Sequence, residues 1–341
     1  MDLYFIVAGI CFAIALAGTW AGTWLVLRHL QRRQILDLPN ERSSHTRPTP
    51  RGGGIAAVIV LAIMIGGILQ MAEVPLLPSA IVIGGLVALA LVSWLDDVQG
   101  LSPLPRFTAQ VVVVALATHF WFAPGAAAVA GAFSIPAWPL LILIAIAWLW
   151  FINLFNFMDG IDGLAGVEAA SIGFAVFAMG AVTGHGFGFG IMGAAIFGAA
   201  LGFLRFNWHP ARIFMGDVGS VPLGFLLGWL LLTLCVNPAP SGIAAFAVIV
   251  PLYFLADASI TIARRILRGE KFWRPHREHF YQKALASGRS HARVSGIVAL
   301  TNVLLIVLAL AALLIEPWPA LVAAIVLTAT VLALFARSRP P

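Results

Sequence analysis

The sequence contains few charged residues and very little cysteine. Only 10% of its 341 residues are charged, whereas soluble domains usually carry about a quarter. Hydrophobic residues make up 61% of the chain, and apolar runs recur along its whole length. Each run is long enough to cross a hydrocarbon layer of about 30 Å. These features exclude an ordinary soluble domain and indicate a polytopic membrane protein.

The two cysteines, Cys11 and Cys235, both lie in apolar runs. We therefore expect small buried side chains rather than a disulfide framework. The first apolar run has no basic segment before it and is followed by Arg28, so we interpret it as a retained helix and not as a signal peptide. No separate soluble domain is evident, which predicts a single membrane-embedded domain over residues 1–341.

The apolar runs predict an all-α fold with about eleven transmembrane helices. The predicted spans are 3–27, 53–71, 79–95, 107–122, 137–155, 167–183, 189–205, 219–236, 241–262, 294–315 and 319–336. The loops predicted on one face are 28–52, 96–106, 156–166, 206–218 and 263–293.

The positions of the cations give the orientation. With eleven spans, all 20 lysines and arginines fall on the same face, and the opposite loops carry only Asp2, Glu73 and Glu316. The positive-inside rule then predicts a periplasmic N-terminus and a cytoplasmic C-terminus, in the inner membrane of a bacterium. The net charge of +6 describes this one face, which would attract anionic membrane lipid. No nucleic-acid-binding module accompanies it, so no nucleic-acid partner is expected.

Several carboxylates gather at the same depth on the predicted cytoplasmic face. Asp96 and Asp97 end one span, Asp217 precedes another, and Asp257 lies in the last turns of a third. Carboxylates at a membrane edge are costly unless they are paired, hydrated or bound to a cation. Helix capping would explain any one of them, but the adjacent pair has no basic neighbour within the next eight residues. Oxygen ligands of this kind suit Mg²⁺ or Mn²⁺ rather than zinc.

The stretch NLFNFMDGIDGLAG carries a polar residue at every third position. These residues are Asn153, Asn156, Asp159 and Asp162. A row with this spacing drifts by about 60° per step around a helix, and the nearby glycines favour a turn. We expect the two asparagines on a last helical turn and the two aspartates on a loop that folds back into a cavity.

Basic segments lie on the same predicted face. The segment RPHREHFYQKAL is better suited to a phosphorylated substrate than to zinc, because too few ligands accompany its histidines. A solvated loop would also explain its arginines. Arg51 and the following three glycines open the second span, where backbone N–H groups could meet an anion. Close helix packing explains the glycines about as well.

Five ordered motifs resemble one family, the polyprenyl-phosphate N-acetylhexosaminyl-1-phosphate transferases of the glycosyltransferase family 4 type. The motifs are SSHTRPTPRGGG, LDDVQGLSPLPRFTAQ, NLFNFMDGIDGLAG, RIFMGDVGSVPLG and HREHF. The sequences of the first two motifs look most like those of the branch that initiates O-antigen or a related heteropolysaccharide. The resemblance implies transfer of a sugar 1-phosphate from a UDP-N-acetyl amino sugar to undecaprenyl phosphate, with release of UMP and dependence on Mg²⁺. It leaves the sugar and a homodimer open.

The resemblance also implies roles for residues on the cytoplasmic face. Asp217 would be the principal metal ligand, with Asn156 close by. Asp162 would bind the uracil edge and Phe214 would stack on its ring. The candidate catalytic residues are Asp96, Asp97, Asp159 and Asp217, with Asp96 a candidate base. The candidate substrate-binding residues are His45, Arg51, Arg106, Asp162, Phe214, His276, Arg277 and His279.

Two departures argue against peptidoglycan synthesis, the alternative within the family. Gly100 stands where the muramoyl-pentapeptide enzymes have the lysine of DDxxK, and the last motif is not a run of three histidines.

A proton-coupled transporter is the alternative outside this family. Transporters usually place acids near the bilayer midplane and often contain repeats, whereas these acids lie at one face. A structural or regulatory scaffold would leave the order of the five motifs unexplained.

Overall fold

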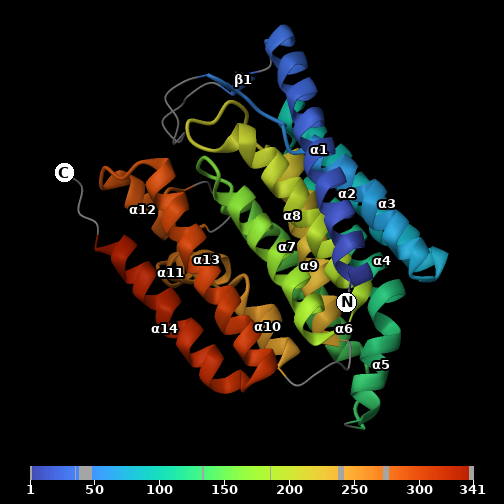
Figure 1. The fold of residues 1–341 in the computed structure, drawn as a ribbon. Coiled ribbons are helices and arrows are strands. Elements are labelled where there is room, and N and C mark those ends of the chain that lie inside the picture. Colours follow the sequence, from blue (N-terminus) through green and yellow to red (C-terminus); the bar gives the residue numbers. More distant parts are fainter. Residues whose placement is uncertain are drawn as a thin grey trace.

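The computed structural model describes residues 2–34, 36–37, 48–132, 134–184, 186–236, 242–271 and 276–337. These residues are mostly helical and include one two-stranded antiparallel sheet (Figure 1). The first half contains α1 Asp2–Arg33, β1 Leu36–Asp37, β2 Thr49–Pro50, α2 Ile55–Met71, α3 Leu76–Gln99, α4 Pro103–Ala117, the π-helix η1 Thr118–Phe122, α5 Ala123–Ala132 and α6 Trp138–Phe157. The second half contains α7 Leu164–Thr183, α8 Phe187–Asn207, α9 Asp217–Val236, α10 Ile243–Ile249, α11 Leu252–Leu267, α12 Phe280–Ala286, α13 His291–Leu314 and α14 Pro317–Ala336.

The helices have the length and apolarity that a multi-pass membrane protein needs. Among the described residues, nine segments are long and apolar enough to cross a membrane: α1, α3, α4 continued through η1 and α5, α6, α7, α8, α9, α13 and α14. The pair α10 and α11 forms a bent tenth segment, and α2 is a shorter apolar helix of 17 residues. The helical, multi-pass character is confirmed. The count of eleven spans and their orientation stay predictions.

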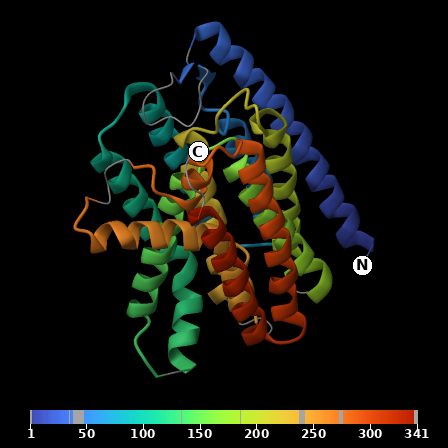
Figure 2. The same ribbon diagram turned by 90° about the vertical axis from the view of Figure 1, so that its left-hand side faces the viewer.

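The predicted span 241–262 is a broken helix. The axis turns by 64° between α10 and α11. Pro251 lies at this break. It has no N–H to donate to the preceding turn, and its ring clashes with that turn, which favours a kink or a break at this point. Figure 2 shows the orange α11 lying across the direction of the neighbouring red helices.

Helix α9 is the core of the bundle. Nearly all of its side chains are buried, and it packs against α3 and α6. Helix α1, in contrast, lies at the outside and packs mainly along α8 (Figure 1). Because α9 starts inside the bundle, its first residues meet the ends of α3 and α6. This meeting point holds most of the predicted polar site.

Candidate active site

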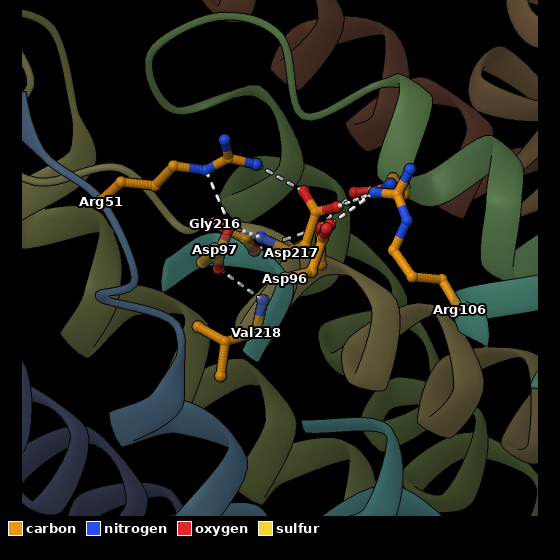
Figure 3. Close-up of polar contacts among 9 residues, drawn as sticks. Arg51, Asp96, Asp97, Arg106, Gly216, Asp217 and Val218 are labelled. Atoms are coloured by element: carbon orange, nitrogen blue, oxygen red, sulfur yellow. Dashed lines mark hydrogen bonds and ion pairs between the residues drawn. The ribbon is translucent and has the colours of Figure 1, made fainter. Parts of the chain in front are cut away.

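Two helix ends bring three carboxylates together. Asp96 and Asp97 lie in the last turn of α3, and Asp217 is the first residue of α9. Their side chains are only 9%, 4% and 14% exposed, respectively. Figure 3 shows the three carboxylates between Arg51 and Arg106, which approach from opposite sides.

The two arginines hold the carboxylates through ion pairs. Arg51 places Nε 3.0 Å from Asp97 Oδ1 and Nη2 2.6 Å from Asp217 Oδ1. Arg106 Nη1 lies 2.5 Å from Asp96 Oδ2 and 3.3 Å from Asp217 Oδ2. Asp217 therefore contacts both guanidinium groups. Each arginine side chain is more than a third exposed, so both groups form a partly open wall that can also face a phosphate.

Asp97 also fixes the start of α9. Its two carboxylate oxygens accept hydrogen bonds from the backbone N–H groups of Asp217, at 3.3 Å, and Val218, at 3.0 Å. A carboxylate at this position complements the positive end of a helix. Gly216, just before α9, has a φ of 74°, and a Cβ there would lie 2.7 Å from Asp97 Oδ2. The chain can bring Asp97 this close only because residue 216 is glycine.

The three glycines after Arg51 pack against protein and not against an anion. The N–H groups of Gly52 and Gly53 both donate to the carbonyl of Phe214, at 3.1 and 2.9 Å, and Gly54 N–H donates to Met215 at 3.0 Å. A Cβ on Gly54 would lie 2.4 Å from the Cα of residue 219. The anion-binding interpretation of these N–H groups is therefore wrong, and close packing is correct. The same bonds place the partly buried Phe214 beside Arg51.

The stretch 153–166 has the predicted local shape. Helix α6 contains Asn153 and Asn156 and ends at Phe157, and a turn then carries Asp159 and Asp162 to the start of α7. Asn156 Oδ1 accepts a hydrogen bond of 2.6 Å from the hydroxyl of Ser220 in α9.

Asp159 belongs electrostatically to the carboxylate cluster. Burial raises the pKa of Asp159 well above its usual range; Arg51 opposes this shift, while Asp217 and Asp97 add to it. Asp217 and Asp97 raise the pKa of Asp159 because carboxylates that lie close together in a poorly solvated site repel one another when ionised. Asp159 is therefore the fourth acidic group of the site.

Asp162 lies in a second cluster with two histidines. Its Oδ2 lies 2.7 Å from His209 Nδ1 and accepts from the Ala211 N–H at 3.1 Å. Its Oδ1 lies 3.2 Å from His291 Nδ1. Burial alone would raise the pKa of Asp162, but the hydrogen bonds from His291, His209 and Ala211 outweigh it and lower that pKa.

This second cluster could also hold a cation. One ligand atom from each of Asp162, His209 and His291 can lie within 4.8 Å of the others. Two imidazoles and one carboxylate suit a transition metal better than Mg²⁺, which prefers oxygen. The three side chains already contact one another through Asp162, so the geometry does not require an ion.

The predicted histidine segment lies beside α11 and α12. His279 is buried, His276 is partly buried and Arg277 is exposed. Burial lowers the pKa of His276 to about 4, helped by positive charge on His279 and Arg265. The remaining candidate, His45, lies outside the residues that the structure describes.

The structure thus distributes the predicted residues over three adjoining groups. The central group contains Arg51, Asp96, Asp97, Arg106, Asp159 and Asp217, with Asn156 and Phe214 beside it. Asp162 belongs to the second group, and the histidine segment forms the third.

The motif interpretation missed four supporting residues. Ser220 supports Asn156, and His209 and His291 contact Asp162. Asn207 accepts from the Gly163 N–H at 3.0 Å and donates to the Ile213 carbonyl at 3.0 Å, so it joins two loops of the site. Asn207 and His209 lie just before the RIFMGDVGS motif, and this proximity was the one signal that could have indicated them.

Comparison with known proteins identifies the family. The profile described as glycosyl transferase family 4 matches residues 79–235. The decaprenyl-phosphate N-acetylglucosaminephosphotransferase of Mycolicibacterium smegmatis is 30% identical over 291 residues, which cover 75% of this chain and 70% of the relative. The probable undecaprenyl-phosphate N-acetylglucosaminyl 1-phosphate transferase of Bacillus subtilis is 29% identical over 304 residues, covering 83% and 78%. A phospho-N-acetylmuramoyl-pentapeptide-transferase of Desulforamulus reducens is 33% identical over 199 residues, covering 53% and 58%.

The multi-pass helical fold and these similarities define a membrane-embedded phosphosugar transferase. The chain belongs to the glycosyl transferase family 4, as its five motifs indicated.

Proposed function

We propose that the chain transfers an N-acetylated amino-sugar 1-phosphate from a UDP-sugar to undecaprenyl phosphate. The products would be a lipid-linked sugar diphosphate and UMP, and the reaction would initiate O-antigen or a related surface polysaccharide. The observation that carries the proposal is the meeting of three carboxylates and two arginines where α3 ends and α9 begins. Such a site can bind both phosphates and a divalent cation. The names of the mycobacterial and Bacillus relatives support the same substrate class.

The donor set of the central group fits a hard cation. Three carboxylates face only two guanidinium groups in the ion pairs described, and Asp159 lies within electrostatic reach. The excess of oxygen ligands and negative charge suits Mg²⁺, with Mn²⁺ as an alternative. Asp217 and Asn156 would hold the ion, which would neutralise charge on the UDP diphosphate when bound.

The side chains around the cation would bind and orient the two substrates. Arg51 and Arg106 already lie at the edge of the cluster and can turn from carboxylate to phosphate oxygens. Phe214 and Asp162 would hold the uracil, and Asp96 would orient the acceptor phosphate. A phosphate monoester has a second pKa of about 6, so the acceptor is largely dianionic at neutral pH and needs no strong base. We favour its direct attack on the β-phosphorus of the donor.

A proposed orientation is linked to the same site. The end of α1 and the sheet lie at one end of the bundle, shown uppermost in Figure 1, and Arg51 after β2 reaches Asp97 at the end of α3 and Asp217 at the start of α9. We propose that this end faces the cytoplasm of a bacterium, where UDP-sugars are available, and that the N-terminus is periplasmic. The prenyl chain would remain in the membrane beside the apolar helices. A homodimer is compatible with this arrangement.

A donor panel tests the proposal. Purified protein receives undecaprenyl phosphate, Mg²⁺ and, in turn, the UDP derivatives of N-acetylglucosamine, N-acetylgalactosamine, N-acetylfucosamine and N-acetylquinovosamine. UDP-N-acetylmuramoyl-pentapeptide is included because of the Desulforamulus relative. We expect equal amounts of UMP and lipid-linked sugar with at least one amino sugar, and loss of both with EDTA. Turnover of the muramoyl donor alone would move the assignment to peptidoglycan synthesis, and no turnover with any donor would refute transfer.

A further inference from the structure

The histidine segment is held in place by a buried carboxylate of α11. Asp257 lies in the middle of α11 and is 0% exposed. Its Oδ1 lies 3.1 Å from His279 Nδ1 and accepts from the Phe280 N–H at 3.0 Å. Its Oδ2 accepts from the Tyr281 N–H and the Tyr253 hydroxyl, each at 3.1 Å. A buried carboxylate is stable only with such a set of donors.

These contacts fix the direction of the His279 ring. Both oxygens of Asp257 accept from backbone N–H groups of the segment, and Oδ1 also faces His279 Nδ1. The His279 side chain in addition accepts from the backbone N–H of Gln282 in a capping box, while Gln282 Oε1 accepts from the His279 N–H at 3.2 Å. The imidazole is therefore held with its Nδ1 edge against α11.

A second set of contacts holds the same segment from both sides. Arg265 of α11 contacts Glu278, and its Nη1 also lies 2.8 Å from Glu270 Oε2. On the other side, the Tyr281 hydroxyl donates to the Phe157 carbonyl at 3.1 Å, where α6 ends. His279 is therefore fixed between α11 and the turn that carries the acidic residues of the site. Capping of α12 accounts for the bonds between His279 and Gln282, and the contact of the imidazole with Asp257 is additional to them.

We infer that Asp257 is a positioning residue for the transfer reaction, which acts by holding the His279 imidazole against α11, beside the turn that carries the acidic residues of the site. Held there, the imidazole would contact the diphosphate of the UDP-sugar. The inference rests on the proposed function, in which His279 contacts that diphosphate. It adds a residue that acts through His279 and not through its own contact with substrate.

A double-mutant cycle tests this inference. Asp257→Asn, His279→Asn and the double variant are compared with wild type for kcat and KM of the UDP-sugar. We expect Asp257→Asn alone to lower kcat about 100-fold, because a displaced catalytic contact has an effect of this size. In the His279→Asn background, Asp257→Asn should lower kcat by less than about threefold, because the effects of two residues that act together do not add. A purely structural role would reduce activity equally in both backgrounds, and this result would overturn the inference.

Controls separate the possible failures. Glu168→Gln changes another wholly buried acid, which accepts from Asn302 in α13, and should leave turnover unchanged; a loss equal to that of Asp257→Asn would overturn the inference. Wild type without any transfer would instead refute the proposed function.

If Asp257→Asn does not fold, two replacements of His279 test the role of Asp257. His279→Asn keeps an N–H near Nδ1 and should unfold at the wild-type temperature without turnover, whereas His279→Gln loses that bond and should be less stable. Equal stability of the two, or full turnover of His279→Asn, would contradict the role of Asp257.

Discussion

The adjacent residues Asp96 and Asp97 have different surroundings and therefore different proposed tasks. Asp97 is nearly buried and binds Arg51 together with two backbone N–H groups at the start of α9. These bonds position Asp217. Asp96 instead faces Arg106, from which an incoming phosphate could separate it. Asp96 is thus the better candidate for direct contact with the acceptor, and Asp97 for organisation of the site.

His276 gives a prediction about pH. Because burial and neighbouring positive charge lower its pKa to about 4, the folded protein binds a proton there less readily than the unfolded chain, whose histidines titrate near 6.5. His276 therefore stabilises the fold fully above pH 6.5, and this contribution is lost as the pH falls toward 4. His276→Gln should remove that dependence.

The measurement is thermal unfolding in detergent for both proteins between pH 7.5 and about 4.5. The groups facing His276 include His279, Arg265, Arg268 and Glu278, and they are identical in both proteins. Wild type should lose stability relative to the variant as the pH falls. A constant difference across this range would show that His276 is not held neutral by its surroundings.

Single residues of the site were predictable where a motif carried them, but their partners were not. Asp162 was identified from its stretch, whereas its partners His209 and His291 lie 47 and 129 residues away in the sequence. Local spacing contains no information about such pairings, because they arise only when loops from different helices meet. For the same reason Asp257 was identified as an acid in a span, but not as a support for His279.

At the level of elements, the contact between α2 and α9 determines the position of Asp217. Gly54→Ala would place a methyl group 2.4 Å from the Cα of Gly219 and 2.8 Å from Met215 Cγ. The two helices would have to separate, which typically costs about 1–3 kcal/mol. We expect a lower unfolding temperature and lower turnover, because α9 begins with Asp217.

A matched control lies further along the same helix. Gly67 of α2 has open space where a Cβ would be added, so Gly67→Ala should be neutral or slightly stabilising. Thermal unfolding and UMP release measure both variants. Equal behaviour of the two alanine variants would contradict the packing role of Gly54.

Hydropathy predicted the existence of the elements better than their shape. Among the described residues, each of the eleven predicted ranges coincides largely with helix, because length and apolarity are properties of the local sequence. The break at Pro251 was overlooked, although proline itself was a signal for it. The bend directs α11 toward the histidine segment, where Asp257 meets His279.

For the whole molecule, the apolar outer surface and the polar end have separate tasks. Large hydrophobic side chains are exposed on outer helices, such as Ile63 at 72%, Leu91 at 61% and Ile146 at 60%. Such a surface suits contact with lipid tails. The acidic and basic groups of the central site instead gather where α3 ends and α9 begins. Under the proposed function, a water-soluble sugar nucleotide and a lipid phosphate would meet there, which would account for a cluster of carboxylates in a membrane protein.

The most direct test of this account is the turnover of Asp217→Asn. It is measured as UMP and lipid-linked sugar, with the donor that wild type accepts, undecaprenyl phosphate and Mg²⁺. The variant keeps the shape of the side chain but removes the charge that faces both arginines, so we expect a loss of about 1,000-fold or more in a protein that still folds. Glu316→Gln, an exposed change just before α14, should retain wild-type turnover. Full activity of Asp217→Asn would contradict the assignment of the transfer reaction to this site.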